Sequence, residues 1–280
     1  MAMSTMQNRT TLQLREVRKV FARNTIDEVT ALDGINLDVY DQDFITIIGS
    51  NGAGKSTLLN IIAGVFPPEW GGRVIINGVD VTGLAEYRRA AYVSRVWQEP
   101  HIGTAGQLTI EENLSLALRR GQPKGIQKAT SKHLRELFCG DLTPLGLGLE
   151  DRLNTSVGTL SGGQRQALAL VMATIGRPAI LLLDEHIATL DPKTAKTVLQ
   201  LTDEVMRRDK LTAIMVTHNM EIALRYGNRL IMMHKGRIIV DMGDTDKKAL
   251  NVGDLVAAFE RASGEEFDDD TILLSRKEEG

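Results

Sequence analysis

The sequence predicts an α/β fold in which a largely parallel β-sheet is interrupted by a helical insertion. Apolar, β-branched segments alternate with segments of helical periodicity along the 280-residue chain. A glycine-rich turn joins one predicted strand directly to a helix, and the stretch from about residue 99 to 176 is helical in character. Alternating strands and helices are typical of parallel sheets, because a parallel connection needs a long crossover.

The first half of the chain is predicted to be rich in strands. Residues 12–21 and 31–40 have strand character, and "FITIIG" at 44–49 is a short buried strand. "KSTLLNIIAGV", which follows the glycine-rich turn, has helical spacing. Residues 71–83 predict a hairpin that turns at Asn77-Gly78.

The second half places helices before and between further strands. Helices are predicted in residues 109–121, 128–140 and 192–208, and strands in 179–185, 211–218 and 228–243. "VGDLVAAFERASG", at 252–264, predicts a last amphipathic helix. We expect one domain over 10–240, with its helical subdomain at about 99–176, and an acidic extension over 241–280.

Composition limits the classes of function. The net charge is −3, and residues 241–280 hold twelve acidic against five basic side chains, so a basic surface for nucleic acid is not expected. Cys139 is the single cysteine, which excludes an internal disulfide and fits a reducing compartment. The first ten residues lack the apolar core of a signal peptide, and no run reaches the ~18 apolar residues of a membrane span, so we expect a soluble chain.

The glycine-rich turn, "GSNGAGKST", fits the phosphate-binding pattern G-x-x-x-x-G-K-[ST] between a strand and a helix. Its backbone N–H groups can form an anion nest at a helix N-terminus, Lys55 can reach the outer phosphates, and Ser56 can ligate Mg²⁺. The alternative is a glycine turn that matches by chance. The motif predicts binding of a nucleoside triphosphate, by Gly49, Ser50, Asn51, Gly52, Ala53, Gly54, Lys55, Ser56 and Thr57.

A second strand, "ILLLDE", ends in two carboxylates. In proteins with such a glycine-rich phosphate-binding turn, or P-loop, an Asp at the end of a neighbouring strand holds Mg²⁺. This predicts that Asp184 is a Mg²⁺ ligand. Glu185 would face the γ-phosphate and take a proton from the attacking water. A solvated strand end or a helix cap is the alternative. A P-loop kinase also needs the Asp, whereas the adjacent Glu favours hydrolysis.

"TLSGGQRQALALVMATIG" predicts a second helix start suited to an anion, with Ser161 as N-cap. An ordinary capped helix is the alternative. "LSGGQ", lying after the P-loop and shortly before "ILLLDE", resembles the signature motif of the ATP-binding cassette (ABC) family, and the resemblance covers roughly residues 12–240. It implies a P-loop NTPase fold of ABC type, with an antiparallel β subdomain, and nucleotide contacts from Ser161, Gly162, Gly163 and Gln164.

The resemblance also implies roles for four residues outside these motifs. Gln98 matches the glutamine that contacts Mg²⁺ or the attacking water, and Phe21 the aromatic that stacks on adenine, although a core phenylalanine is the alternative. His218 matches the histidine that contacts the γ-phosphate, where a structural histidine is the alternative. Asp191 matches the aspartate that crosses the dimer interface.

The chain departs from the family pattern near the catalytic carboxylates. His186 stands where the family usually has proline, which puts the local loop geometry in doubt without affecting the identity of Glu185. The usual Ser-Ala-Leu-Asp is replaced by Ala188-Thr189-Leu190-Asp191, so an interface bond from the first hydroxyl is lost or made by Thr189.

The resemblance further implies a head-to-tail dimer, expected to be a homodimer, with ATP and Mg²⁺ between the P-loop of one chain and the signature of its mate. It implies a transporter ATPase of importer type, held on the cytoplasmic face of the membrane by permease subunits and served by a substrate-binding protein. Residues 216–239 are similar to importers associated with aromatic amino acid binding proteins. The alternative is a soluble ABC ATPase acting on nucleic acid or ribosomes, although the long coiled coils or second cassette of that class are not present.

Overall fold

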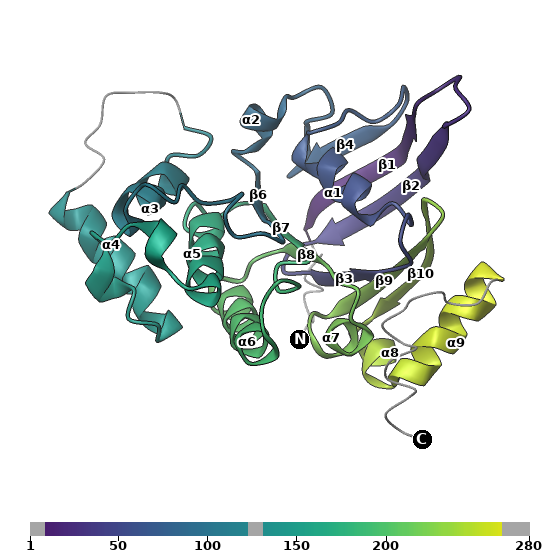
Figure 1. Cartoon of the computed structure of the whole chain (residues 1–280). Helices are drawn as coiled ribbons and strands as arrows, with labels where there is room; N and C mark the ends of the chain where they lie inside the picture. Colours follow the sequence, from purple (N-terminus) through teal and green to yellow (C-terminus); the bar gives the residue numbers. More distant parts are fainter. Residues whose placement is uncertain (1–8, 123–130, 265–280) are drawn as a thin grey trace, which may run out of the picture. The chain divides into compact units, whose positions relative to one another are not determined.

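The computed structural model describes residues 9–122 and 131–264. The chain divides into two compact units, residues 1–84 with 211–280 and residues 85–210, and each is described by itself. Figure 1 shows their elements in sequence colours. The start of the chain, residues 128–130 of the predicted helix at 128–140, and residues 265–280 of the predicted acidic extension lie outside the described residues.

The first unit contains an antiparallel sheet with the strand order β2-β1-β4-β5. The β4–β5 hairpin is confirmed, since Asn77 and Gly78 both have positive φ, as a type I′ turn requires. The four strands are β1 (Thr10–Phe21), β2 (Val29–Tyr40), β4 (Arg73–Ile76) and β5 (Val79–Asp80).

The same unit holds a parallel group of strands. β3 (Phe44–Ile48), buried along its whole length, lies between two strands that run parallel to it, and a fourth strand pairs antiparallel with β9. These are β8 (Ala213–Val216), β9 (Arg229–His234) and β10 (Arg237–Gly243). The unit's helices are α1 (Lys55–Ala63), α7 (Met220–Arg225), α8 (Asp244–Lys248) and α9 (Val252–Ser263). The predicted last helix is confirmed as α9, which buries Leu255, Val256 and Phe259 against residues of α7, β3 and β9.

The second unit combines two parallel strands with most of the helices. Strand β6 (Val93–Val96) pairs parallel with β7 (Ile180–Asp184). Its α-helices are α2 (Glu86–Arg89), α3 (Ile110–Leu118), α4 (Lys132–Leu142), α5 (Gly162–Thr174) and α6 (Pro192–Asp209). Short 3₁₀ turns are Thr143–Leu145, Glu150–Arg152 and Val157–Thr159. Apolar residues of α3, α4 and α5 form a core of their own, centred on the fully buried Leu114, Phe138 and Leu168.

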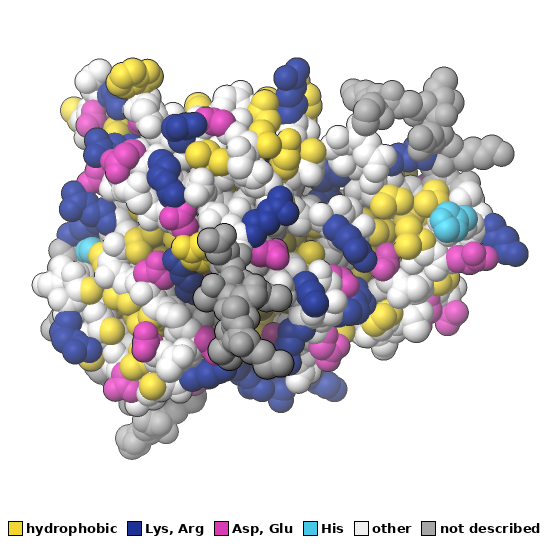
Figure 2. All heavy atoms as spheres, turned by 180° about the vertical axis from the view of Figure 1, so that it is seen from behind, with side chains coloured by type: hydrophobic (Ala, Val, Ile, Leu, Met, Phe, Trp, Pro, Cys, Tyr) yellow, Lys and Arg dark blue, Asp and Glu magenta, His cyan; other side chains and the backbone are white. Residues whose placement is uncertain are grey.

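Charged side chains of both signs are interspersed over the face shown in Figure 2. None of the described helices is both long enough and apolar enough to cross a membrane.

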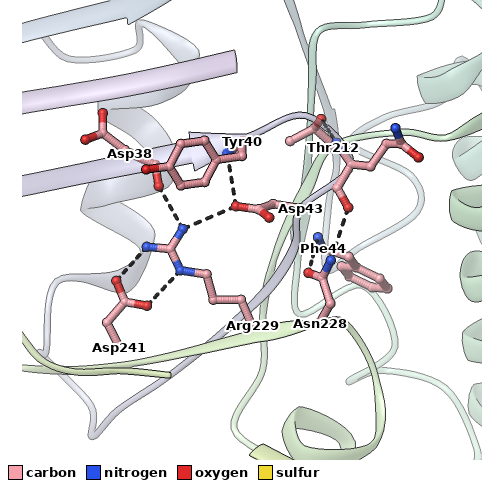
Figure 3. Close-up of polar contacts among 9 residues, drawn as sticks. Asp38, Tyr40, Asp43, Phe44, Thr212, Asn228, Arg229 and Asp241 are labelled. Atoms are coloured by element: carbon pink, nitrogen blue, oxygen red, sulfur yellow. Dashed lines mark hydrogen bonds and ion pairs between the residues drawn. The ribbon is translucent and has the colours of Figure 1, made fainter. Parts of the chain in front are cut away.

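Arg229 of β9 contacts three segments of the first unit, the end of β2, the start of β3 and β10 (Figure 3). Its guanidinium donates to both carboxylate oxygens of Asp241, at 2.7 and 2.6 Å, to Asp43 Oδ2 at 3.2 Å, and to the carbonyl of Asp38 at 2.7 Å. The Arg229 side chain is only 17% exposed. The hydrogen bond with Asp241 is the main reason that the pKa of Arg229 is raised. The arginine thus ties β2, the start of β3 and β10 to β9.

We expect Arg229→Met to lower the free energy of unfolding by about 2–3 kcal/mol, because it leaves two partly buried carboxylates without their cation. Urea denaturation measures this loss. Arg237→Met is the matched control, since Arg237 pairs with Asp33 at 2.6 Å but is 69% exposed, and such surface pairs contribute under about 1 kcal/mol. Equal losses in the two variants would contradict the structural role of Arg229.

Lys247 of α8 is buried, and its ammonium group donates to the carbonyls of Tyr226 and Gly227, just beyond the end of α7. Burial lowers the pKa of Lys247 to about 8 from its ordinary value near 10.5. Between these two values the unfolded chain holds more protons than the folded one, so this residue's contribution to stability rises with pH. Below about pH 8 both states are protonated and the contribution is constant.

We therefore expect the stability of the wild type relative to Lys247→Met to increase from pH 8 to pH 10, by up to about 1.4 kcal/mol per pH unit. Denaturant unfolding at a series of pH values measures this slope. Lys248→Met is the control, because Lys248 is exposed and its pair with Asp244 lies at the surface. A flat difference between wild type and Lys247→Met would show that the buried amine keeps its ordinary pKa.

Candidate functional site

In the first unit, the glycine-rich loop follows the buried strand β3 and leads into α1, as predicted. Gly49, Gly52 and Gly54 all have positive φ. A Cβ atom would lie 2.1 Å from the carbonyl oxygen of Met233 at Gly49, and 2.3 Å from that of Ala31 at Gly54. Glycine is therefore required at both positions by the close approach of neighbouring backbone.

The start of α1 presents the groups that a triphosphate needs. No side chain caps the N-terminus of this nine-residue helix at Gly54, so its first amides face the loop. The buried Lys55 amine donates to the carbonyls of Gly49 and Ser50, at 2.5 and 3.0 Å, which holds its charge within the loop. Ser56 is exposed and Thr57 half-buried. These features fit a nucleoside phosphate chain.

His218 lies at the same edge of the parallel strands as this loop. β8 runs parallel to β3, with Val216 paired to Ile47, and the amide of Thr217 donates to the Ile47 carbonyl at 3.2 Å. The carboxyl ends of adjacent parallel strands meet at one edge, where α/β proteins bind ligands. The structure thus brings half-buried His218 and the phosphate loop to one edge of the first unit.

Phe21, the predicted adenine-stacking residue, is the last residue of β1 and is half-buried. Its ring packs edge-to-face on Phe66, with centroids 5.4 Å apart, and the amine of Lys19 lies 5.6 Å from its centroid. The ring therefore has a packing partner and an exposed part. Stacking on adenine remains a prediction.

In the second unit, the two predicted carboxylates and Gln98 follow neighbouring parallel strands. Val96 of β6 pairs with Leu183 of β7, so Asp184, the last residue of β7, and Gln98, two residues after Val96, lie at the same edge. Gln98 is exposed, and its carbonyl accepts from the hydroxyl of Thr189 at 3.3 Å. Glu185 has φ 45°, a left-handed conformation that is uncommon outside glycine and that often marks functional positions.

His186 is fully buried rather than directed at solvent. Its Nε2 lies 3.1 Å from the Thr202 hydroxyl, which itself donates to the Val198 carbonyl at 2.8 Å. Nε2 must therefore be the donor, and Nδ1 is left buried without a hydrogen-bond partner. Burial lowers the pKa of His186 to about 4, so the ring is neutral near pH 7. His186 thus anchors the loop after Glu185 to α6.

The predicted signature segment starts α5 with a complete capping box. The amide of Gln164 donates to the Ser161 hydroxyl at 3.3 Å, and the Gln164 side chain accepts from the Ser161 amide at 3.2 Å. Ser161 and Gly162 are exposed. A Cβ atom at Gly163 would lie 2.2 Å from Cγ2 of Thr194, so this glycine allows α5 to pack closely on the start of α6.

Asp191 is the N-cap of α6. Its Oδ1 accepts from the Thr194 amide at 3.1 Å, and hydrogen bonds from Thr194 hold the pKa of Asp191 below its ordinary value. The residue is exposed and keeps its charge at neutral pH. Asp191 can cap α6 and also lie at the predicted dimer interface, because the hydrogen bond that caps the helix uses its Oδ1.

Sequence reasoning did not identify Arg95, which lies on β6, three residues before Gln98. Its guanidinium forms an ion pair with Asp184 inside the second unit. Only the alternation of "VSRVWQ" could have indicated a partner, because a charged residue within a short buried strand needs one. No group of three or more His, Cys, Asp or Glu side chains suited to a metal is found among residues 9–122 and 131–264.

A phosphate-binding loop between strand and helix, and a carboxylate pair at a parallel strand end, define a P-loop nucleotide hydrolase. The chain belongs to the ABC transporter family, because the sequence model of that family matches residues 32–188. It is therefore an ATP-binding and ATP-hydrolysing protein, and the predicted family and activity are confirmed.

The chain resembles the Tyrosine transport ATP-binding protein of Clostridioides difficile, with 43% identity over 90% of this chain and 99% of that protein. It is also 33% identical to the Methionine import ATP-binding protein MetN of Rhizobium johnstonii, over 80% of this chain but only 59% of the relative. This chain thus matches about three fifths of MetN.

Solved structures show the same fold. The dimeric, post-hydrolysis form of an ATP-binding cassette bound to ADP and phosphate has 29% identity and a TM-score of 0.68, over 83% of this chain and 98% of the other. An ATP-binding cassette of an ABC transporter in its ADP conformation has 27% identity and a TM-score of 0.73, over 89% and 98%. The predicted P-loop NTPase fold of ABC type is confirmed.

Proposed function

We propose that this chain is the ATP-hydrolysing subunit of an ABC importer that takes up an aromatic amino acid. The observation that carries the proposal is the similarity over 99% of a protein named for tyrosine transport. The relatives named for methionine, spermidine/putrescine and sulfate import support uptake as the direction. We propose that permease subunits hold the chain on the cytoplasmic face of the membrane and that a substrate-binding protein delivers the ligand.

We propose a role in nucleotide binding or hydrolysis for each of the predicted site residues. The phosphate loop, Gly49 to Thr57, would hold the phosphates, Phe21 would stack on adenine, and His218 would contact the γ-phosphate. Ser56, Gln98 and Asp184 would supply oxygen ligands, which Mg²⁺ prefers. When bound, Mg²⁺ neutralises phosphate charge. Glu185 would accept the proton of the attacking water.

We propose that two copies complete each site head to tail. Ser161, Gly162, Gly163 and Gln164 of one copy would contact the nucleotide held by the phosphate loop of the other, and Asp191 would lie at the interface. The exposure of Ser161 and Gly162 at the start of α5 supports this arrangement, since a helix N-terminus favours an anion. A solved relative is described as dimeric.

Reconstitution tests the transport function. The chain is co-expressed with permease subunits, and the purified complex is reconstituted into proteoliposomes. Uptake of labelled tyrosine is then measured in the presence of a substrate-binding protein, with ATP supplied either inside or outside the liposomes. Uptake that needs ATP on the side of this subunit is the expected result. Retention of the chain by ribosomes or nucleic acid, without a copurifying membrane subunit, would instead favour a soluble ABC ATPase.

A further inference from the structure

Arg95 makes a partly enclosed ion pair with the proposed metal ligand. Its side chain is 8% exposed and that of Asp184 is 14% exposed, and Arg95 Nη2 donates to Asp184 Oδ2. The two residues belong to adjacent parallel strands, in which Arg95 pairs with Leu182, two residues before the aspartate. The pair is therefore fixed by the strand register and screened from solvent.

The guanidinium also lies against an aromatic ring. Arg95 Cζ lies 3.8 Å from the centroid of the Trp97 ring, a stacking distance for a planar cation. Trp97 is in turn fixed through its backbone, because its carbonyl accepts from the buried Gln166 of α5 at 3.1 Å. The Arg95 guanidinium thus contacts both the Asp184 carboxylate and the Trp97 ring, directly before Gln98.

We propose that Arg95 is a positioning residue, which neutralises Asp184 before the divalent cation binds and then competes with that cation for the carboxylate. The inference rests on the proposed role of Asp184 as a metal ligand. A fixed positive charge beside a ligand opposes a second cation, and more strongly where solvent is excluded. When the guanidinium is released from Asp184, its position relative to the Trp97 ring changes. Because Trp97 directly precedes Gln98, this movement connects metal binding with the Gln98 segment.

Mn²⁺ binding measures the competition without any turnover. The free Mn²⁺ signal is followed by electron paramagnetic resonance in titrations of the whole protein with saturating ADP. We expect Arg95→Met to lower the apparent Kd for Mn²⁺ about fivefold or more, and Arg95→Gln to do the same. Arg95→Lys keeps the charge and should stay within about twofold of the wild type.

Arg88→Met is the matched control, because Arg88 is an exposed arginine beside Tyr87, with Cζ 5.8 Å from the ring centroid. It should leave the Kd unchanged. An unchanged or higher Kd in both Arg95→Met and Arg95→Gln would overturn the role of Arg95. Asp184→Asn separates the two proposals: wild-type Mn²⁺ affinity in that variant would remove Asp184 as a metal ligand, whereas weakened affinity there supports it.

Tryptophan fluorescence tests the link to the Gln98 segment. Trp70 is fully exposed, so Trp70→Phe leaves Trp97 as the single tryptophan with little disturbance. In this background, ADP with Mg²⁺ should change the Trp97 emission relative to ADP alone, and the added Arg95→Met substitution should abolish that change. Identical Trp97 emission with and without Mg²⁺ would overturn the release of the guanidinium.

Discussion

Replacing Glu185 with Gln is expected to reduce ATP turnover by about two to four orders of magnitude while ATP binding is kept. The amide has the size of the carboxylate but cannot accept a proton from water, and general base catalysis contributes a factor of this order. The left-handed backbone at Glu185 is no harder for Gln to adopt than for Glu, so the loop should stay folded.

The measurements are phosphate release under saturating ATP and size-exclusion chromatography with Mg²⁺ and ATP. Because hydrolysis releases the proposed dimer, the variant should accumulate as a dimer when ATP is present. Glu204→Gln makes the same chemical change at an exposed position of α6 and should behave as the wild type. Normal turnover by Glu185→Gln would remove Glu185 as the base.

The parts of the site that could be predicted are those encoded by neighbouring residues. The phosphate loop, the capped start of α5 and the Asp-Glu pair are each contiguous, and their local chemistry follows from residue types at fixed spacing. The fold class was also predictable, because strand and helix periodicity alternate along the chain. The sheet topology then explains why His218 and the phosphate loop lie at the same edge of the first unit's parallel strands. Each follows the carboxyl end of one of two adjacent parallel strands, β8 and β3.

The parts that could not be predicted depend on contacts between distant residues. Arg95 and Asp184 are 89 residues apart, and the partners of Arg229 in β2 and at the start of β3 lie 186 to 191 residues away. No local pattern identifies which carboxylate a buried arginine will meet. His186 illustrates a further limit of sequence reasoning: its substitution for proline was visible, but its burial against Thr202 depends on how α6 packs.

Replacing Ser161 with Arg is expected to abolish ATP hydrolysis and to leave ATP binding by the monomer near normal. The substitution places a long cation at the exposed start of α5, where the proposed dimer needs a small hydroxyl close to the partner's nucleotide. Ser161 is not among the residues proposed to bind the nucleotide of its own chain, so the monomer's own binding groups are unchanged. Fluorescent-nucleotide titration and phosphate release measure the two properties on the same preparation.

Loss of the cap must be separated from the steric effect. Ser161 accepts from the Gln164 amide, and removal of such a cap costs about 1 kcal/mol of stability, as Ser161→Ala will measure. Ser131→Arg makes the same change at the N-cap of α4, where Ser131 accepts from the Leu134 amide at 3.2 Å, and should retain hydrolysis. Weakened nucleotide binding by monomeric Ser161→Arg would contradict a site completed by the second copy, because the signature would then contact the nucleotide of its own chain.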